Sequence, residues 1–191
     1  MGKDKRSFPL LDIDHSYNDA NHIPHSLNTE QRSTYDMIMA GSKQGGLFFV
    51  DGPGGTGKTF LYRALLTKLH SSDKLAVATH TSGVIVDVMP GARMAHSCFK
   101  IPLTLQEDGW CSFMKQSGTA KLLQQAALII WDEVSMTKRQ NMEALNNNLR
   151  DIMGRSHIPF GEKTIVLGGD FRQDHLNVRK GLRAQIFGAS L

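Results

Sequence analysis

A glycine-rich octapeptide carries the strongest chemical signal in the sequence. Residues 52–59 read Gly-Pro-Gly-Gly-Thr-Gly-Lys-Thr and match the phosphate-loop pattern G-x-x-x-x-G-K-[ST] at each fixed position. Glycine lets the backbone turn sharply, so that successive N–H groups converge on an anion. The pattern predicts that Lys58 reaches the β- and γ-phosphates of a nucleoside triphosphate, and that the Thr59 hydroxyl takes one site on Mg²⁺. The expected nucleotide-binding residues of this loop are Gly52, Pro53, Gly54, Gly55, Thr56, Gly57, Lys58 and Thr59.

An acidic pair, Asp132-Glu133, follows the apolar run 128–131. Carboxylates at the carboxyl end of a strand lie where an open α/β sheet holds its ligand. Asp132 is expected to hold Mg²⁺ through the water shell of the ion, and Glu133 to be the general base that orients and deprotonates the attacking water. This division of roles indicates hydrolysis. The alternative is an ordinary acidic turn at the end of a strand.

A third signal follows the last apolar run, where the chain reads Gly168-Gly169-Asp170-Phe171-Arg172-Gln173. A glutamine at the end of a strand can donate a hydrogen bond to a γ-phosphate oxygen and so report whether that phosphate is present. Gln173 therefore joins Lys58 and Glu133 as a catalytic candidate. The alternative is an ordinary Gly-Asp turn.

Four short apolar runs must place these side chains. They cover residues 47–50, 75–79, 127–131 and 164–167, with helical patterns between most of them. Continuous apolar runs are typical of parallel strands, because helices cover both faces of a parallel sheet. The sequence therefore predicts one α/β domain with a mostly parallel sheet and helices on both faces.

Two helices are predicted around the phosphate loop. The first covers residues 28–40 and ends at Gly41, with Asn28 as its N-cap and Gln31 in the reciprocal position of a capping box. The second carries apolar residues at helical spacing over residues 60–70. The phosphate loop thus lies between a strand and a helix, which is the context that its pattern requires.

Two further helices are predicted over residues 82–89 and 137–153, the second ending at a glycine. Residues 100–118 contain Pro102, Asp108-Gly109 and Trp110 and are expected to form a loop or a small insertion. Residues 1–26 are polar, show no sustained periodicity and are expected to be irregular.

Composition limits the class of protein. The 191 residues hold 22 Lys+Arg and 18 Asp+Glu, and the net charge of +4 permits a polyanionic partner without requiring one. Cys98 and Cys111 match no metal-ligand spacing and are too few for a disulfide framework, which indicates free thiols in an intracellular, reducing compartment. The chain holds no stretch near the roughly 18 apolar residues of a membrane span.

Together these segments resemble the Pif-one (petite integration frequency) family of superfamily one DNA helicases, especially its eukaryotic members and the helicase domains of rolling-circle transposons. The resemblance runs from about Leu27 to the carboxyl end. It rests on six ordered motifs: residues 27–31 (adenine-reading segment), 52–59 (motif I), 79–83 (motif Ia), 95–102 (a DNA-contacting segment), 131–136 (motif II) and 169–173 (motif III).

The resemblance implies a RecA-like P-loop NTPase fold over residues 27–191, in which the motif III strand inserts between the phosphate-loop strand and the strand of Asp132. It implies that Asn28 and Gln31 contact the adenine of ATP. For Gln31 the capping box is a second role, and both are retained.

The resemblance also implies contacts with single-stranded DNA. Thr81 and Ser82 would present hydroxyls and backbone amides to DNA phosphates, and the alternative is that they form the N-cap of the next helix. His96 and Phe99 would offer a π-face to bases or support the groove, and the alternative is a core or hinge role.

The implied activity is an ATP-dependent 5′–3′ DNA helicase motor that uses Mg²⁺ with ATP and serves telomere maintenance, DNA repair and recombination. The implied compartment is the nucleus, with the mitochondrion as the alternative. A second RecA-like domain, normally in cis, would supply an arginine finger worth roughly 10³- to 10⁵-fold in rate. The sequence stops at Leu191, before that domain, so slow hydrolysis is expected.

One departure from the family follows the sensor, where Asp174-His175 replaces an apolar residue and no proline occurs. Two other classes of function stay open. The first is a nucleotide-binding module without turnover. The second is an unrelated phosphate-loop kinase or switch, for which the adenine and sensor segments would be coincidences.

Overall fold

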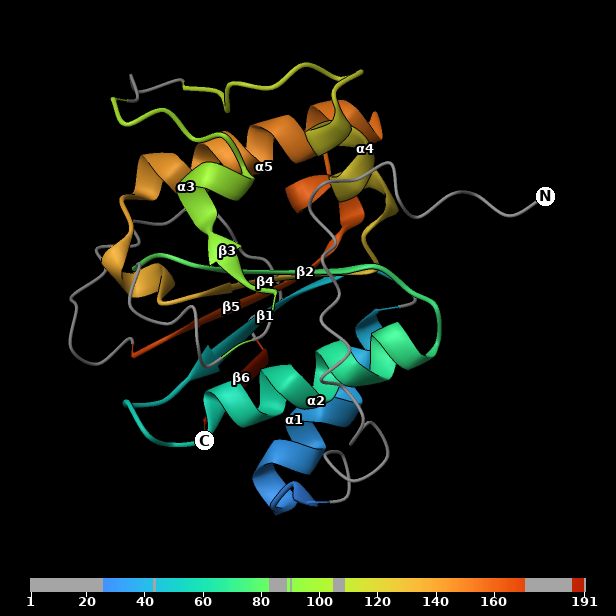
Figure 1. Ribbon diagram of the computed structural model, residues 1–191, viewed down its shortest axis with the longest axis vertical. Helices are drawn as coiled ribbons and strands as arrows, with labels where there is room; N and C mark the ends of the chain where they lie inside the picture. Colours follow the sequence, from blue (N-terminus) through green and yellow to red (C-terminus); the bar gives the residue numbers. More distant parts are fainter. Residues whose placement is uncertain are drawn as a thin grey trace.

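The structure is a computed structural model that describes residues 26–42, 44–82, 89, 91–104 and 109–170, and residues 187–190 as backbone alone. Of the predicted helix over residues 82–89, the first and last residues lie within these ranges and the rest lie outside them. The sensor segment is described as far as Asp170, and Gln173 lies outside the described residues. In the described part, six strands form one sheet in the order β3-β2-β4-β5-β1-β6, and every pair is parallel. Figure 1 shows this sheet between two layers of helices.

The four predicted apolar runs became the four central strands. These are β1 (Gly46–Asp51), β2 (Ala76–His80), β4 (Leu128–Asp132) and β5 (Thr164–Gly169). Strand β5 pairs with β4 on one side and with β1 on the other, which confirms the predicted insertion of the motif III strand. The sequence analysis did not identify β3 (Arg93–Met94) or β6 (Phe187–Ser190), which are too short to carry a period.

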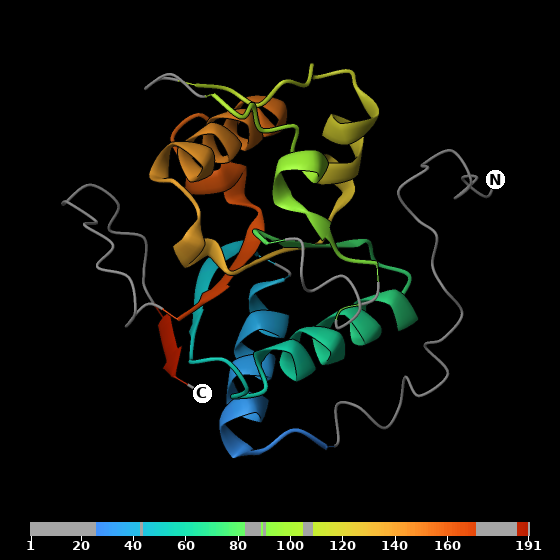
Figure 2. The ribbon, with the colours of Figure 1, turned by 60° about the vertical axis from the view of Figure 1, so that its left-hand side comes forward.

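Helices cover both faces of the sheet, as predicted. On one face lie α1 (Thr29–Gly41) and α2 (Lys58–Ser71), and on the other lie α3 (Ala95–Cys98), α4 (Gly118–Gln125) and α5 (Arg139–Met153). Figure 2 shows the same two layers after rotation. The described helices include none that is long and apolar enough to cross a membrane.

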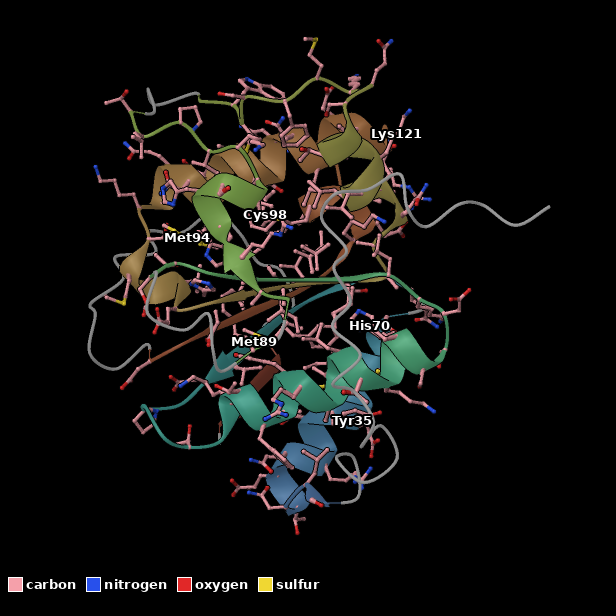
Figure 3. The ribbon with its side chains drawn as sticks, viewed as in Figure 1. Tyr35, His70, Met89, Met94, Cys98 and Lys121 are labelled. Carbon is pink, nitrogen blue, oxygen red and sulfur yellow. The ribbon has the colours of Figure 1, made fainter. Side chains whose placement is uncertain are left out.

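Helices cover both faces of each central strand, and alternate residues along a strand therefore belong to different cores. In β4, Ile129 and Trp131 join the core beneath α4 and α5, whereas Leu128 and Ile130 join the core beneath α1 and α2. Figure 3 shows Cys98 on the first side of the sheet and Tyr35 and His70 on the second. The sheet is therefore rigid up to the carboxyl ends of its strands, where the predicted site residues begin.

The ends of α1 and α5 follow their local signals. Asn28 caps α1, and its side chain and that of Gln31 form the predicted capping box. Gly154 ends α5 in the left-handed conformation at φ 65°. The predicted start of α5 at Thr137 is wrong: a 3₁₀ turn, η4 (Val134–Met136), comes first, Thr137 is extended, and the helix begins after Lys138.

Helix α4 was not predicted, although its boundary agrees with the end of the expected loop. Ser117 caps it through a hydrogen bond from Ala120 N to Ser117 Oγ of 3.2 Å. At its other end Lys163 Nζ donates to the carbonyl oxygens of Gln124 and Ala126, at 2.5 and 2.9 Å. A cation at a helix C-terminus satisfies carbonyls that lack a partner within the helix.

Candidate nucleotide-binding site at the carboxyl edge of the sheet

The phosphate loop connects the carboxyl end of β1 to the first residue of α2. Gly52 N donates to Gly169 O at 3.1 Å, which ties the start of the loop to the end of β5. Gly55 and Gly57 take φ values of 85° and 86°, which glycine adopts without strain. A Cβ added at Gly54 or Gly55 would meet nothing within 4 Å, so the protein does not fill the space beside this part of the loop.

Lys58 and Thr59 open helix α2 and are both half-buried. Lys58 Nζ donates to the carbonyl oxygens of Gly52 and Pro53, the second at 3.1 Å, so the ammonium group lies folded over the loop. The helix N-terminus adds a partial positive charge at the same place. Lysine, loop amides and helix dipole together make a site suited to a phosphate chain.

Helix α1 contacts the phosphate loop through one side chain. Gln31, which is buried, accepts a hydrogen bond from Asn28 N at 3.1 Å and donates from Nε2 to Gly57 O at 3.4 Å. A Cβ at Gly57 would displace this amide from its position, and the φ of 86° itself favours glycine. The capping box is thus confirmed, and adenine contact by Asn28 and Gln31 stays a prediction.

Asp132 ends β4 and is 3% exposed. Burial raises the pKa of its carboxyl group, while the hydrogen bond from Glu133 N and the charge of Lys58 act in the opposite direction. Within the described residues, both hydrogen bonds to this side chain fall on Oδ1, from Glu133 N at 2.9 Å and from Tyr62 Oη at 3.5 Å. Both contacts orient the carboxylate at the end of β4.

The residues present fit Mg²⁺. A threonine hydroxyl and a carboxylate are hard oxygen donors, and Mg²⁺ is usually held by one or two such groups together with phosphates and water. Thr59 and Asp132 supply this donor set from the start of α2 and the end of β4.

Tyr62 is a site residue that the sequence analysis missed. It lies on α2 one turn after the phosphate loop, is fully buried, and donates its hydroxyl to Asp132. Burial and the nearby Asp132 carboxylate raise the pKa of Tyr62 well above its ordinary value, so the phenol stays a donor. A Cβ at Gly168 would collide with this hydroxyl and lie 2.5 Å from Asp132 Oδ1, so glycine makes the arrangement possible.

Glu133 adopts the left-handed conformation, with φ 55° and ψ 35°. This backbone is uncommon for a residue with a side chain and is characteristic of functional sites. The half-buried carboxylate accepts a hydrogen bond from Ser82 Oγ at 2.5 Å. The general-base candidate therefore contacts the segment predicted to bind DNA.

Thr81 and Ser82 follow β2 and lie beside the acidic pair. Thr81 N donates to Asp132 O at 3.1 Å, and Trp131 Nε1 donates to Thr81 Oγ1 at 3.0 Å. Both residues are half-buried, so part of each remains accessible. The alternative role as an N-cap involves residues outside the described ranges.

The two remaining DNA candidates differ. His96 is half-buried on α3, with its Nε2 3.2 Å from Asn141 Nδ2. Phe99 is fully buried and packs against Trp131, with ring centroids 5.4 Å apart. For Phe99 this burial favours the core role, which the sequence left open as an alternative, over a π-face for bases. Its role is in the core that supports Trp131.

Because the strands are parallel, the predicted segments meet at one edge of the sheet. The phosphate loop follows β1, Thr81-Ser82 follows β2, Asp132-Glu133 ends β4, and Gly168-Gly169 ends β5. Gln173, in the segment after β5, lies outside the described residues, so its sensor role stays a prediction.

Comparison with known proteins agrees with this arrangement. The model of the PIF1-like helicase family matches residues 26–191. Over 147 residues, 77% of this chain, it is 33% identical to the ATP-dependent DNA helicase PIF1 of Trypanosoma brucei brucei. It is 28% identical over 152 residues, again 77% of this chain, to the helicase PIF4 of the same organism. The chain spans 14% and 18% of the length of these two curated relatives.

Solved structures of Pif1 from Bacteroides share the fold. The unliganded protein has a TM-score of 0.61 and 25% identity, over 78% of this chain and 32% of that one. The complexes with ADP-AlF4 and with single-stranded DNA have TM-scores of 0.62 and 0.60 at 24% and 23% identity. They cover 78% and 75% of this chain, and 33% and 32% of those chains. Because the family model matches residues 26–191, which include the sheet and the candidate site, this chain belongs to the PIF1-like helicase family.

Proposed function

We propose that this chain is an ATP-binding motor domain of a DNA helicase that moves 5′ to 3′ along single-stranded DNA. The observation that carries the proposal is the hydrogen bond between Ser82 and Glu133, which joins the predicted DNA segment to the predicted catalytic base. The match to the PIF1-like helicase family supports the same class of activity.

In this proposal the loop binds the phosphates of ATP through its backbone N–H groups and through Lys58. Lys58 exchanges its hydrogen bonds with Gly52 O and Pro53 O for bonds with the β- and γ-phosphates, which are stronger because the acceptor is charged. Mg²⁺, when bound, neutralises charge on the β- and γ-phosphate oxygens. Thr59 and Asp132 would hold it, with Tyr62 fixing the orientation of the carboxylate.

Glu133 is proposed to accept a hydrogen bond, and then the proton, from the water that attacks the γ-phosphate. Its position is fixed by the bond from its backbone N–H to Asp132 Oδ1 at 2.9 Å. Gln173 would report the presence of the γ-phosphate from the segment that follows β5. These are the roles of a hydrolase and not of a passive binding module.

Unwinding requires a second RecA-like domain, which we propose lies in cis in a longer protein. Support comes from the curated relatives, of which this chain spans less than a fifth. Single-stranded DNA as the substrate is supported by the complex of Bacteroides Pif1 with that ligand. Telomere maintenance, DNA repair and recombination, in the nucleus or alternatively the mitochondrion, are proposed from the resemblance to the family.

Steady-state ATPase assays with and without oligo-dT test the proposal on the chain itself. We expect a slow turnover that oligo-dT increases and that Glu133→Gln abolishes while ATP binding remains. Glu143→Gln, a surface carboxylate on α5 that pairs with Arg139, is the matched control. ATP binding without turnover in any condition would support the binding module instead, and phosphate transfer to a small acceptor would contradict both readings.

A further inference from the structure

The turn Thr81-Ser82 is tied to the acidic pair by contacts that involve three consecutive residues of motif II. Trp131 donates through its indole to Thr81 Oγ1 at 3.0 Å, and Asp132 O accepts from Thr81 N at 3.1 Å. Glu133 Oε2 accepts from Ser82 Oγ at 2.5 Å. The first two contacts hold the turn in place, whereas the third joins two side chains that are both half-buried and accessible.

The backbone around Ser82 and Glu133 leaves these side chains little choice of partner. Ser82 O contacts His80 Nδ1, which ties Ser82 to the end of β2. Glu133 N is fixed to Asp132 Oδ1, and its left-handed backbone aims the side chain toward the end of β2. The short Oγ–Oε2 distance is typical of a hydroxyl that donates to an ionised carboxylate.

A serine hydroxyl has one hydrogen and donates to one acceptor at a time. We propose that Ser82 is a positioning residue for Glu133, and that a phosphate of single-stranded DNA competes with Glu133 for this hydrogen. The inference rests on the proposed function and adds to it a route by which DNA reaches the catalytic base. With the hydroxyl on Glu133, one of the acceptor sites of the carboxylate is taken; with the hydroxyl on phosphate, that site can accept from water and the carboxylate loses a donor that holds its orientation.

The Ser82–Glu133 bond and DNA binding are thermodynamically linked in this proposal, so DNA affinity tests it without any measurement of ATP turnover. If DNA must take the hydroxyl from Glu133, weakening that bond in advance strengthens DNA binding by the same factor. Glu133→Gln weakens it, because a neutral amide oxygen is a poorer acceptor than a carboxylate. The change also removes a negative charge near the DNA, and this second effect does not depend on the hydroxyl.

A double-mutant cycle separates the two effects. The affinity for a fluorescently labelled oligo-dT is measured by anisotropy, at one salt concentration, for the 191-residue chain. The four proteins are the wild type, Ser82→Ala, Glu133→Gln and the double variant. We expect Glu133→Gln to raise affinity about two- to tenfold more when Ser82 is present than when alanine replaces it. Equal effects in both backgrounds would overturn the inference and leave the proposed function intact.

The controls keep every outcome informative. Ser82→Thr retains a hydroxyl and is expected to restore the coupling, and Ser82→Cys, a weak donor of similar size, replaces the alanine variant if that protein does not fold. Glu143→Gln removes a surface charge and is expected to show the same effect with or without Ser82. A wild-type chain that does not bind oligo-dT would contradict both the inference and the DNA-binding part of the proposed function.

Discussion

Close approaches that only glycine permits shape the candidate site at the scale of single residues. Gly57 leaves room for the amide of Gln31, and Gly168 leaves room for the Tyr62 hydroxyl beside Asp132. The second approach explains why a glycine pair ends β5, where the residues themselves carry no chemistry. The magnesium-binding carboxylate of the proposal is therefore held by α2, β4 and β5 together.

Tyr62→Phe tests whether this support matters for the cation. The variant keeps the ring and loses the hydroxyl, so Asp132 Oδ1 keeps only the bond from Glu133 N. We expect the Mg²⁺ concentration needed for half-maximal binding of a fluorescent ATP analogue to rise about two- to tenfold, the effect of one ordinary hydrogen bond, because the Tyr62–Asp132 bond is long at 3.5 Å. Tyr35→Phe, at the buried tyrosine of α1, is the matched control. Identical titrations for wild type and Tyr62→Phe would rule out a role for the hydroxyl.

The positions of the candidate residues could be predicted where the pattern is local in sequence, and their roles stay predictions. Lys58, Thr59 and the acidic pair lie in short patterns next to a strand end, and the structure places them at one sheet edge. Tyr62 could not be found in this way, because its contact with Asp132 spans 70 residues and depends on the packing of α2 against β4. The sequence left Phe99 open between a DNA-contacting role and a core role, because an aromatic side chain has the same sequence signal whether it faces the core or the solvent.

At the scale of elements, the N-terminus of α1 both caps the helix and contacts the phosphate loop. Gln31 completes the capping box with its carbonyl oxygen and contacts the phosphate loop with its amide nitrogen. The helix start and the loop are therefore positioned relative to each other by one side chain. The two roles that the sequence left open for Gln31 are compatible in this geometry.

Gln31→Glu separates these roles. The carboxylate can still accept from Asn28 N, so the capping box is kept, and the free energy of unfolding is expected to fall by about 1 kcal/mol through loss of the bond to Gly57 O. ATP affinity is expected to fall about tenfold, because the variant has no donor for adenine and places an anion beside Gly57 O. Scanning calorimetry measures the change in stability, and titration calorimetry measures the change in ATP affinity. A variant with unchanged ATP affinity would reduce Gln31 to a helix cap.

Phe99→Leu tests whether Phe99, which follows α3, is a core residue. A smaller side chain in the core beside Trp131 is expected to lower the free energy of unfolding by about 1–2 kcal/mol. The affinity of the folded variant for oligo-dT is expected to remain unchanged. Chemical denaturation and fluorescence anisotropy measure the two quantities. The reverse pattern, with intact stability and weaker DNA binding, would restore the stacking role.

Elements were predicted well where they are long or apolar. The four central strands and both helices beside the phosphate loop lie within two residues of their predicted bounds. The short strands β3 and β6 exist only through pairing with β2 and β1, which no local pattern encodes. Helix α5 began later than its periodicity indicated because η4 and the extended Thr137 first reverse the chain after Glu133.

At the scale of the whole molecule, a half-buried histidine far from the site is expected to make stability depend on pH. Burial lowers the pKa of His70, near the end of α2, from 6.5, and a hydrogen bond with the backbone of Ala76 opposes part of this change. Below pH 6.5 the unfolded chain therefore binds more protons at this position than the folded chain does. Stability is expected to fall as the pH drops from 6.5 toward the lowered pKa of His70.

His70→Gln is expected to reduce this loss of stability between about pH 6.5 and 5, because glutamine does not titrate. Thermal melts across that range provide the measurement, with His157→Gln at an exposed histidine as the control. An equal fall in melting temperature for the wild type and His70→Gln would assign the pH dependence to other groups.

The central claim is that the carboxyl edge of this sheet binds Mg–ATP through the phosphate loop, and calorimetric titration of Mg–ATP tests it most directly. We expect one ATP per chain for the wild type and binding at least about tenfold weaker for Lys58→Ala, which removes a charged donor to the phosphates. Lys68→Ala, at an exposed lysine of the same helix, is expected to bind as the wild type does. Equal affinity of the wild type and Lys58→Ala would contradict the account.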